Sequence, residues 1–108
     1  MTNEFGIIYC TVPNKNEAKK ISKILVKEKL AACVNMIGGV ESYFSWGGKF
    51  CKEKEIMLVI KTQRIHFDKI QYVINQLHTY NVPEIVWVPI LEGSEDYLKW
   101  IAHETLSK

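Results

Sequence analysis

The sequence predicts an α+β domain with the element order β-α-β-β-α-β-α. Three observations lead to this prediction. Two long strand-like segments adjoin in the middle of the chain, and a short apolar run lies on either side of them. A segment of helical periodicity follows the first short run, the pair of long segments and the last short run. With 108 residues, 47% of them hydrophobic and 24% charged, the chain has room for one core, so residues 1–108 are predicted to form one domain.

The first strand is predicted over Phe5 to Val12, a run rich in β-branched and aromatic residues that Pro13 closes. Asn14 then offers a helix N-cap, and Glu17 follows three residues later in capping-box spacing. The helix that begins here carries an apolar stripe on one side. Its members are Ala18, Ile21, Ile24, Leu25 and Leu30.

The central hairpin spans Ala31 to Thr62 and turns at Gly47-Gly48, because glycine readily adopts the positive φ that a tight hairpin turn needs. Each arm is roughly 50 Å long at ~3.3 Å per residue, whereas a compact chain of this size is about 35 Å across. We therefore expect the arms to bend at a bulge, to project beyond the domain, or both. A projecting ribbon with Tyr43, Phe44 and Trp46 is prone to association, so the hairpin predicts an oligomer.

A second helix is predicted over His66 to Tyr80, a turn at Asn81 to Pro83, and a strand over Glu84 to Leu91. Pro89 cannot donate to a neighbouring strand, so this strand should lie at an edge or be bulged. Ser94 caps the last helix. Two right-handed βαβ units that share an antiparallel sheet form the split βαβ, or ferredoxin-like, sandwich, and this fold supports many functions.

Composition excludes several classes of protein. A net charge of +2, with lysines interleaved among acids, argues against a nucleic-acid partner, and no apolar run reaches the ~20 residues that span a membrane. Glu4 and the lack of a positive n-region predict no signal peptide. Cys10, Cys33 and Cys51 lack a metal-type spacing, so we expect buried, reduced thiols and a cytoplasmic protein.

Short motifs follow one another along nearly the whole chain. They are LAACVN at Leu30–Asn35, an aromatic residue followed by W-x-G-K within Phe44–Lys49, E-x-x-L-x-x-K-T at Glu55–Thr62, H-x-Y-x-x-P-E-I at His78–Ile85, and V-P-I with Y-L-x-W at Val88–Ile90 and Tyr97–Trp100. In this order they resemble the CutA family of divalent-cation-tolerance proteins. The resemblance implies a ferredoxin-like fold, a homotrimer whose hairpins pair across subunits, a role in tolerance to copper and other divalent metals, and no enzymatic reaction.

The implied trimer is also similar to the PII signalling proteins, which bind effectors in clefts between subunits. Two functions therefore stay open. One is divalent metal binding or tolerance, and the other is a trimeric effector-binding or scaffold module without a metal role.

The candidate metal ligands are Cys10, at the end of the first strand, and His78, at the end of the second helix, with Glu84 or a neighbouring chain supplying further donors. Thiolate and imidazole suit Cu or Zn ions. Alternatively, Cys10 packs within the sheet and His78 caps its helix. The other histidines, His66 and His103, are expected on helix surfaces.

Three positions depart from the family's common pattern around this histidine. Thr79 stands in place of a proline, Asn81 in place of an acid or amide, and Leu77 where some members have a second histidine. Fewer donors argue against a high-affinity ion site.

A second candidate site is polar and shared between subunits. Glu55 and Lys61 alternate to the same face of their strand, and Tyr80 and Glu84 follow the second helix. A cleft with these groups can hold an anionic or zwitterionic ligand, although a structural ion-pair network at the trimer seam is an equally good interpretation. Trp46 is predicted to anchor the subunit interface.

Two rival functions on this fold are disfavoured. An acylphosphatase needs an arginine in a glycine-rich loop after the first strand, but the only arginine is Arg64. An RNA-recognition module needs stacking aromatic residues on the strand that here reads EIMLVI, Glu55–Ile60, which is aliphatic.

Overall fold

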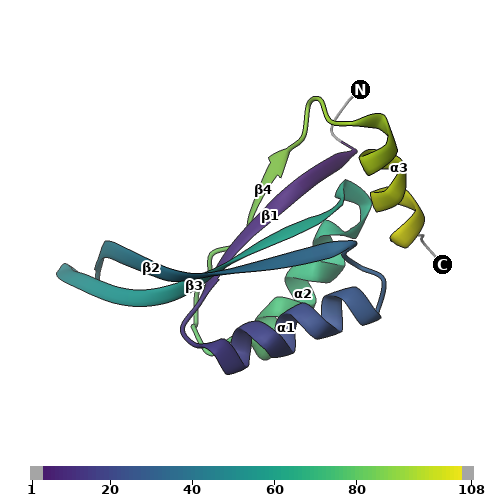
Figure 1. The fold of residues 1–108 in the computed structure, drawn as a ribbon. Helices are drawn as coiled ribbons and strands as arrows, with labels where there is room; N and C mark the ends of the chain where they lie inside the picture. Colours follow the sequence, from purple (N-terminus) through teal and green to yellow (C-terminus); the bar gives the residue numbers. More distant parts are fainter. Residues whose placement is uncertain (1–3, 106–108) are drawn as a thin grey trace.

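The computed structural model describes residues 4–105 and contains a four-stranded sheet of order β2-β3-β1-β4. Its elements are β1 (Phe5–Val12), α1 (Lys15–Lys27), β2 (Cys33–Trp46), β3 (Lys49–Gln63), the 3-10 turn η1 (Arg64–His66), α2 (Phe67–Leu77), β4 (Val86–Pro89) and α3 (Glu95–Glu104). All strand pairs are antiparallel, and α1 and α2 lie on the same side of the sheet (Figure 1). The predicted ferredoxin-like split βαβ sandwich is confirmed.

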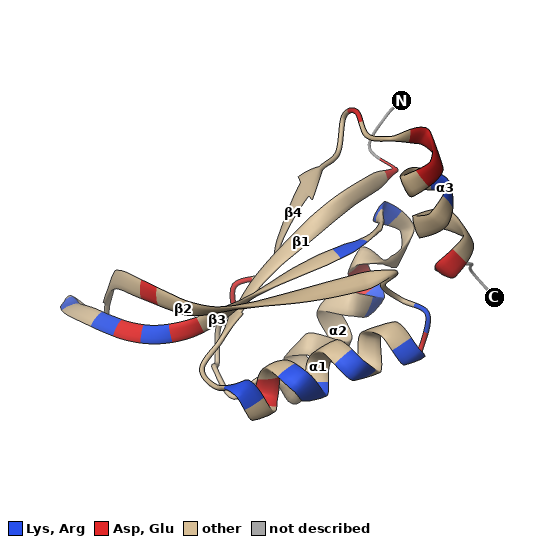
Figure 2. Ribbon diagram, in the orientation of Figure 1, with Lys and Arg blue, Asp and Glu red and all other residues tan. Residues whose placement is uncertain are grey.

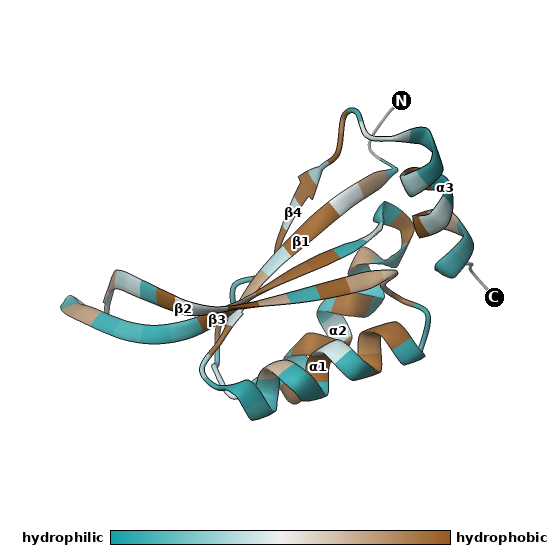
Figure 3. Cartoon of the chain, in the orientation of Figure 1, coloured by the Kyte–Doolittle hydropathy of each residue, from teal (hydrophilic) through white to brown (hydrophobic). Residues whose placement is uncertain are grey.

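The core lies between the sheet and helices α1 and α2. Ile8 and Leu58 on the strands are fully buried against Ile21 of α1 and Ile70 of α2. The helices are amphipathic as predicted: α1 is hydrophilic along its outer side and hydrophobic toward the sheet (Figure 3). Among the described helices, none is both long and apolar enough to cross a membrane.

The central hairpin bends and projects, as its length requires. Gly47 and Gly48 have φ angles of 59° and 78°, which confirms the predicted turn. Ile37 pairs with Met57 and Val40 with Glu55, so two residues of β2 stand opposite one residue of β3. This β-bulge at Gly38-Gly39 bends the ribbon. The hairpin tip extends away from the helices, and the molecule measures 44 × 25 × 23 Å (Figure 1).

The bulge changes which side chains of β2 face which side of the sheet. Strand residues alternate between faces with a period of two, and an inserted residue reverses that alternation. Before the bulge, Ile37 lies on the face away from the helices, opposite Met57. After it, Ser42, opposite Glu53, lies on that same face, together with every second residue toward the tip.

The face of the sheet away from the helices is uncovered and carries an exposed apolar surface. Ile37 is 51% exposed, and Val86 and Val88 on β4 are also exposed. Phe44 and Trp46 continue the apolar surface onto the hairpin. An antiparallel sheet with one face in water normally carries polar residues there, so this face is suited to contact with another molecule.

Several predicted boundaries need correction. The first helix ends at Lys27, so Leu30 belongs to the following turn, in which Lys29 has a φ angle of 61°. The second helix ends at Leu77 and not at Tyr80, because the Thr79 N–H bonds to the Glu17 side chain and the Tyr80 N–H to the His78 side chain, not to carbonyl groups of the helix. The last strand is Val86–Pro89, shorter than predicted, and it lies at the sheet edge, one of the two placements predicted from Pro89.

Two expectations about single side chains are wrong. His66 is buried and not solvated, because its Nε2 lies 2.5 Å from the carbonyl oxygen of Thr105, which joins η1 to the end of α3. Cys33 and Cys51 are only partly buried, because they lie opposite Lys61 and Phe44 on the sheet face away from the helices, and Cys10 alone of the three is in the core. His103 is exposed, as predicted.

We expect Gly6→Ala to destabilise the protein, because a Cβ at Gly6 would overlap the ring of Trp87, which packs against the core. Overpacking of this kind costs about 1–3 kcal/mol in the free energy of unfolding. Urea denaturation at a fixed protein concentration measures the loss. Gly38→Ala is the matched control, because no atom lies within 4 Å of its added Cβ, and equal stability losses in both variants would contradict the prediction.

Candidate functional site

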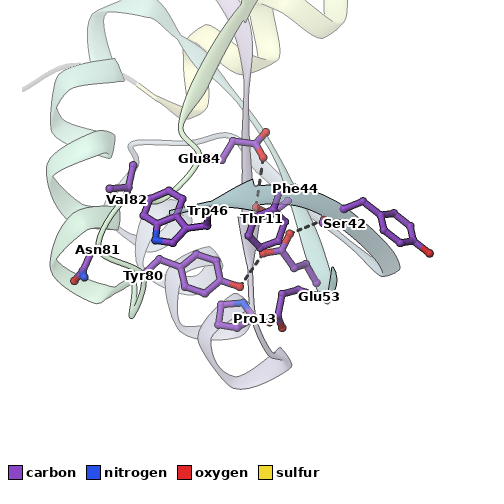
Figure 4. A pocket seen from close by; sticks show the side chains of 12 residues that line it. Thr11, Pro13, Ser42, Phe44, Trp46, Glu53, Tyr80, Asn81, Val82 and Glu84 are labelled. Carbon is purple, nitrogen blue, oxygen red and sulfur yellow. Dashed lines mark hydrogen bonds between the residues drawn. The ribbon is translucent and has the colours of Figure 1, made fainter. Parts of the chain in front are cut away.

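A cleft of about 610 Å³ lies where the hairpin leaves the domain (Figure 4). One wall is the hairpin face created by the bulge, with Ser42, Phe44 and Trp46 from β2 and Glu53 and Glu55 from β3. We call this space the hairpin cleft. Its wall is built from consecutive alternate residues of two paired strands, so their side chains emerge side by side.

The opposite wall is the segment between α2 and β4. Tyr80, Asn81, Val82 and Glu84 line it, and Thr11 at the end of β1 contributes the polar group nearest to Glu84. The Thr11 hydroxyl donates to Glu84 Oε1 over 3.4 Å. The cleft therefore joins residues from the first strand, the hairpin and the last connecting segment.

Glu55 is the central polar residue of the hairpin cleft. The Tyr80 hydroxyl donates to Glu55 Oε2 over 2.8 Å, and the Ser42 hydroxyl donates to Oε1 over 2.7 Å. The side chain is only 8% exposed, and its two partners are neutral. Burial and the hydrogen bond to Glu55 both raise the pKa of the Tyr80 phenol, so Tyr80 remains a hydrogen-bond donor at neutral pH.

Charge in the hairpin cleft is of one sign. Glu53, Glu55 and Glu84 line it without a lysine, arginine or histidine among the lining residues. Within the described part of the chain, none of the three forms an ion pair. Along β3 toward the hairpin tip, by contrast, basic and acidic residues alternate (Figure 2).

The structure brings together four of the five residues predicted for the shared cleft. Trp46, Glu55, Tyr80 and Glu84 line it, but Lys61 does not. Lys61 lies on the same strand face as Glu55, yet six residues farther along β3, where its ammonium group bonds to Asn35 Oδ1. Within one chain, Lys61 is therefore separate from this cleft, and its place in a cleft shared between subunits stays a prediction.

Sequence reasoning missed Ser42, Glu53 and Thr11 as lining residues. The signal for Ser42 was the Gly38-Gly39 pair, because a bulge there reverses the alternation of β2 and places Ser42 beside Glu55. The signal for Glu53 was its spacing of two residues from Glu55 on the same strand. Thr11 gave no such signal, because its role depends on the position of Glu84 in three dimensions.

Cys10 is a poor ligand for a metal ion in this fold. Its side chain is fully buried among core residues, and its Sγ donates to the carbonyl oxygen of Thr11 over 3.8 Å. Burial raises the pKa of the thiol from 9.0 to about 12, and the negative charges of Glu84, Glu17 and Glu55 act in the same direction. Because thiolate is the form that binds metals, the neutral thiol does not suit the task.

Both ring nitrogens of His78 already have partners. Its Nε2 donates to the carbonyl oxygen of Thr11 over 2.8 Å, and its Nδ1 accepts from the backbone N–H of Tyr80 over 3.1 Å. This bonding assigns a neutral ring with the proton on Nε2. Glu17 Oε2 lies 3.3 Å from Nδ1, but Nδ1 already accepts the hydrogen bond of the Tyr80 N–H, so this contact is not an ion pair.

The predicted ligands Cys10, His78 and Glu84 do not fit a metal ion within one chain. Cys10 faces the helices, whereas Glu84 bonds to the side chain of Thr11, and adjacent residues of a strand point to opposite faces. Among residues 4–105, no three His, Cys, Asp or Glu side chains lie close enough together to hold an ion.

Glu17 fixes the segment that carries His78 and Tyr80. Asn14 caps α1 as predicted by accepting from the Glu17 N–H over 2.8 Å, but the reciprocal capping-box bond does not form. Glu17 instead accepts from the backbone N–H of Thr79 over 2.8 Å and from its hydroxyl. The carboxylate thus bonds to the chain immediately after α2, at one end of the hairpin cleft.

We expect Glu17→Ala to lower the free energy of unfolding by about 1–3 kcal/mol, because it leaves the Thr79 N–H without its acceptor. Glu17→Gln keeps an acceptor oxygen and should cost less. Thermal and urea unfolding at a fixed protein concentration measure both. Lys99→Ala, which removes only an exposed ion pair with Glu95, should leave stability nearly unchanged. An equal effect of the alanine and glutamine variants would contradict the role of this bond.

We expect Cys10 to resist alkylation in the folded protein at pH 8 and to react after denaturation, because its thiol is buried and neutral. Since folding raises its pKa from 9.0 to about 12, the folded state binds this proton more tightly. Its contribution to stability is complete below pH 9 and is lost as the pH rises toward 12. Mass spectrometry after iodoacetamide treatment measures the labelling. Rapid labelling of native Cys10 would contradict the assignment.

Comparisons with known proteins agree with the fold. The family model described as "CutA1 divalent ion tolerance protein" matches residues 6–104. The chain is 41% identical over 99 residues to the divalent-cation tolerance protein CutA of Thermus thermophilus, covering 92% of this chain and 96% of that protein. It is also 41% identical to the chloroplastic protein CutA of Arabidopsis thaliana, but spans only 54% of that protein's length.

A solved structure is similar over nearly its full length. The crystal structure of CutA1 from Oryza sativa superimposes with a TM-score of 0.94 at 37% identity, covering 99% of this chain and 98% of that one. Sequence and backbone therefore agree on one assignment. The chain belongs to the CutA1 family of divalent ion tolerance proteins.

Proposed function

We propose that this protein is a homotrimer that contributes to divalent-cation tolerance by binding a small effector in the hairpin cleft. The observation that carries the proposal is the cleft itself, a space of about 610 Å³ with Glu55 held at its centre. Its volume lies in the ordinary range for small-molecule sites. Relatives of the chain are named as divalent-cation tolerance proteins, and this name supplies the proposed connection to divalent cations.

The uncovered face of the sheet supports the homotrimer. Ile37, Val86 and Val88 expose apolar area there, and Trp46 at 60% exposure extends it along the projecting hairpin. A second and a third copy of the chain would remove this area from water and protect the open edges of β2 and β4. Because the hairpin cleft opens beside the same hairpin, assembly would place it near the subunit interface.

Copper or zinc binding by Cys10, His78 and Glu84 is the second candidate, and the family's description favours it. Such a site would require loss of the hydrogen bonds of His78 and ionisation of a buried thiol. These costs favour the effector over a bound ion. We also propose that the protein catalyses no reaction. The thiol of Cys10 is buried and neutral, which does not suit a nucleophile.

We propose a cytoplasmic location. Its support is that Cys10, Cys33 and Cys51 are free thiols, which suits a reducing compartment. The names of related proteins place one in the chloroplast and another in the periplasm, so a fractionation experiment with the natural host decides this point.

We expect native mass spectrometry to show a complex of three chains. Titration with Cu(II) and Zn(II) should give the same ion uptake for the natural protein and for Cys10→Ala/His78→Gln, because these side chains are engaged inside the fold. Ion uptake by the natural protein that is lost in the double variant would favour the metal site. A monomer would overturn the proposed trimer.

A variant pair tests which face forms the complex. Val88→Glu places a charge on the uncovered face and should shift the protein toward monomers. Tyr72→Glu is the matched control, because Tyr72 is a 61% exposed aromatic residue on α2, on the side of the helices. Light scattering coupled to size-exclusion chromatography reports both masses. Dissociation by the Tyr72 variant alone would assign the interface to the helical side.

A further inference from the structure

Building on the proposed function, we infer that the hairpin cleft binds an organic cation, an amine or a guanidine carried on an apolar body. Three features of the described residues combine in this inference: a buried carboxylate without a basic partner, aromatic side chains beside it, and a cavity larger than a metal ion needs.

The first feature is the charge of Glu55. The residue is 8% exposed, and its carboxylate oxygens accept from the neutral hydroxyls of Ser42 and Tyr80. A buried charge is normally balanced by an opposite charge, and among residues 4–105 of the chain no basic residue lines this cleft. Glu53 and Glu84 add negative charge at the margins. The missing partner is therefore cationic.

The second feature is the aromatic surface. Phe44, Trp46 and Tyr80 line the same space as the carboxylates (Figure 4). Ammonium and guanidinium groups bind to aromatic faces because the ring carries negative charge on its face. The hairpin already shows this chemistry, since the Lys52 ammonium group lies 5.4 Å from the ring centre of Tyr43.

The third feature is size, which separates an organic cation from a metal ion. A metal ion needs several donors converging on one point, and no three acidic, histidine or cysteine side chains in residues 4–105 converge in this way. The cleft of about 610 Å³ instead has spaced carboxylates and a largely apolar lining. An apolar body with a charged end uses both properties.

Isothermal titration calorimetry of the full chain tests the inference. The probes are benzylammonium and agmatine, with benzyl alcohol and 1,4-butanediol as neutral molecules of similar shape and phenylacetate as the anion. We expect at least one cation to bind about tenfold more tightly than its neutral counterpart, a difference of about 1.4 kcal/mol. Glu55→Gln should remove that preference, because it removes the negative charge while keeping the size and shape of the side chain.

Glu41→Gln is the matched control. It removes the same charge from the same hairpin, but Glu41 is exposed on the opposite face and does not line the cleft. It should leave the affinity unchanged. Equal losses of cation affinity in both variants would mean that the affinity depends only on the overall charge of the protein, and would overturn the site.

The oligomeric state of each sample separates this inference from the proposed function. A trimer that binds phenylacetate best, or that binds none of the probes, overturns the cationic ligand and leaves the trimer standing. Cu(II) or Zn(II) uptake that Glu55→Gln abolishes, without amine binding, would assign the cleft to a metal. Dissociation of the trimer by Glu55→Gln would assign the carboxylate to a contact between copies. Amine binding by a monomer would support the ligand and overturn the trimer.

Discussion

The β-bulge in β2 is the constraint on which the rest of the structure depends. Two residues, Gly38 and Gly39, stand opposite a single residue of β3, and Gly39 has a φ angle of 75° that most side chains avoid. The resulting reversal of alternation places Ser42 and Phe44 on the face that carries Glu55. Without it, Glu55 would lose a hydrogen-bond donor and the hairpin cleft would lose its aromatic wall.

The two faces of the sheet have different roles. Helices α1 and α2 cover one face and form the core, with Ile8, Ile21 and Ile70 fully buried. The other face keeps Ile37 and Val88 exposed, although burial of such side chains is favourable by roughly 1.5–3 kcal/mol each. The core on one side is the basis of the fold, and the open apolar face on the other is the basis of the proposed trimer.

Two of the predicted metal ligands, Cys10 and His78, form contacts within the fold of one chain. Cys10 fills the core, and His78 bonds to the end of β1 and to the backbone before the cleft. Glu17 holds the same segment through Thr79. These contacts set the position of Tyr80 and thereby of Glu55, so side chains without contact to a ligand determine the shape of the cleft.

The sequence by itself determined the order of the elements, the Gly47-Gly48 turn, the edge position of β4 and the Asn14 cap, because these depend on local backbone preferences and on apolar periodicity. It also placed Glu55, Tyr80 and Glu84 in one site, although only through motifs. Tertiary structure alone decided that Lys61 lies elsewhere, that His66 is buried and that Glu17 bonds to Thr79. The physical reason is distance: each of these outcomes depends on residues far apart in the chain, and local patterns carry no information about which groups meet across the core.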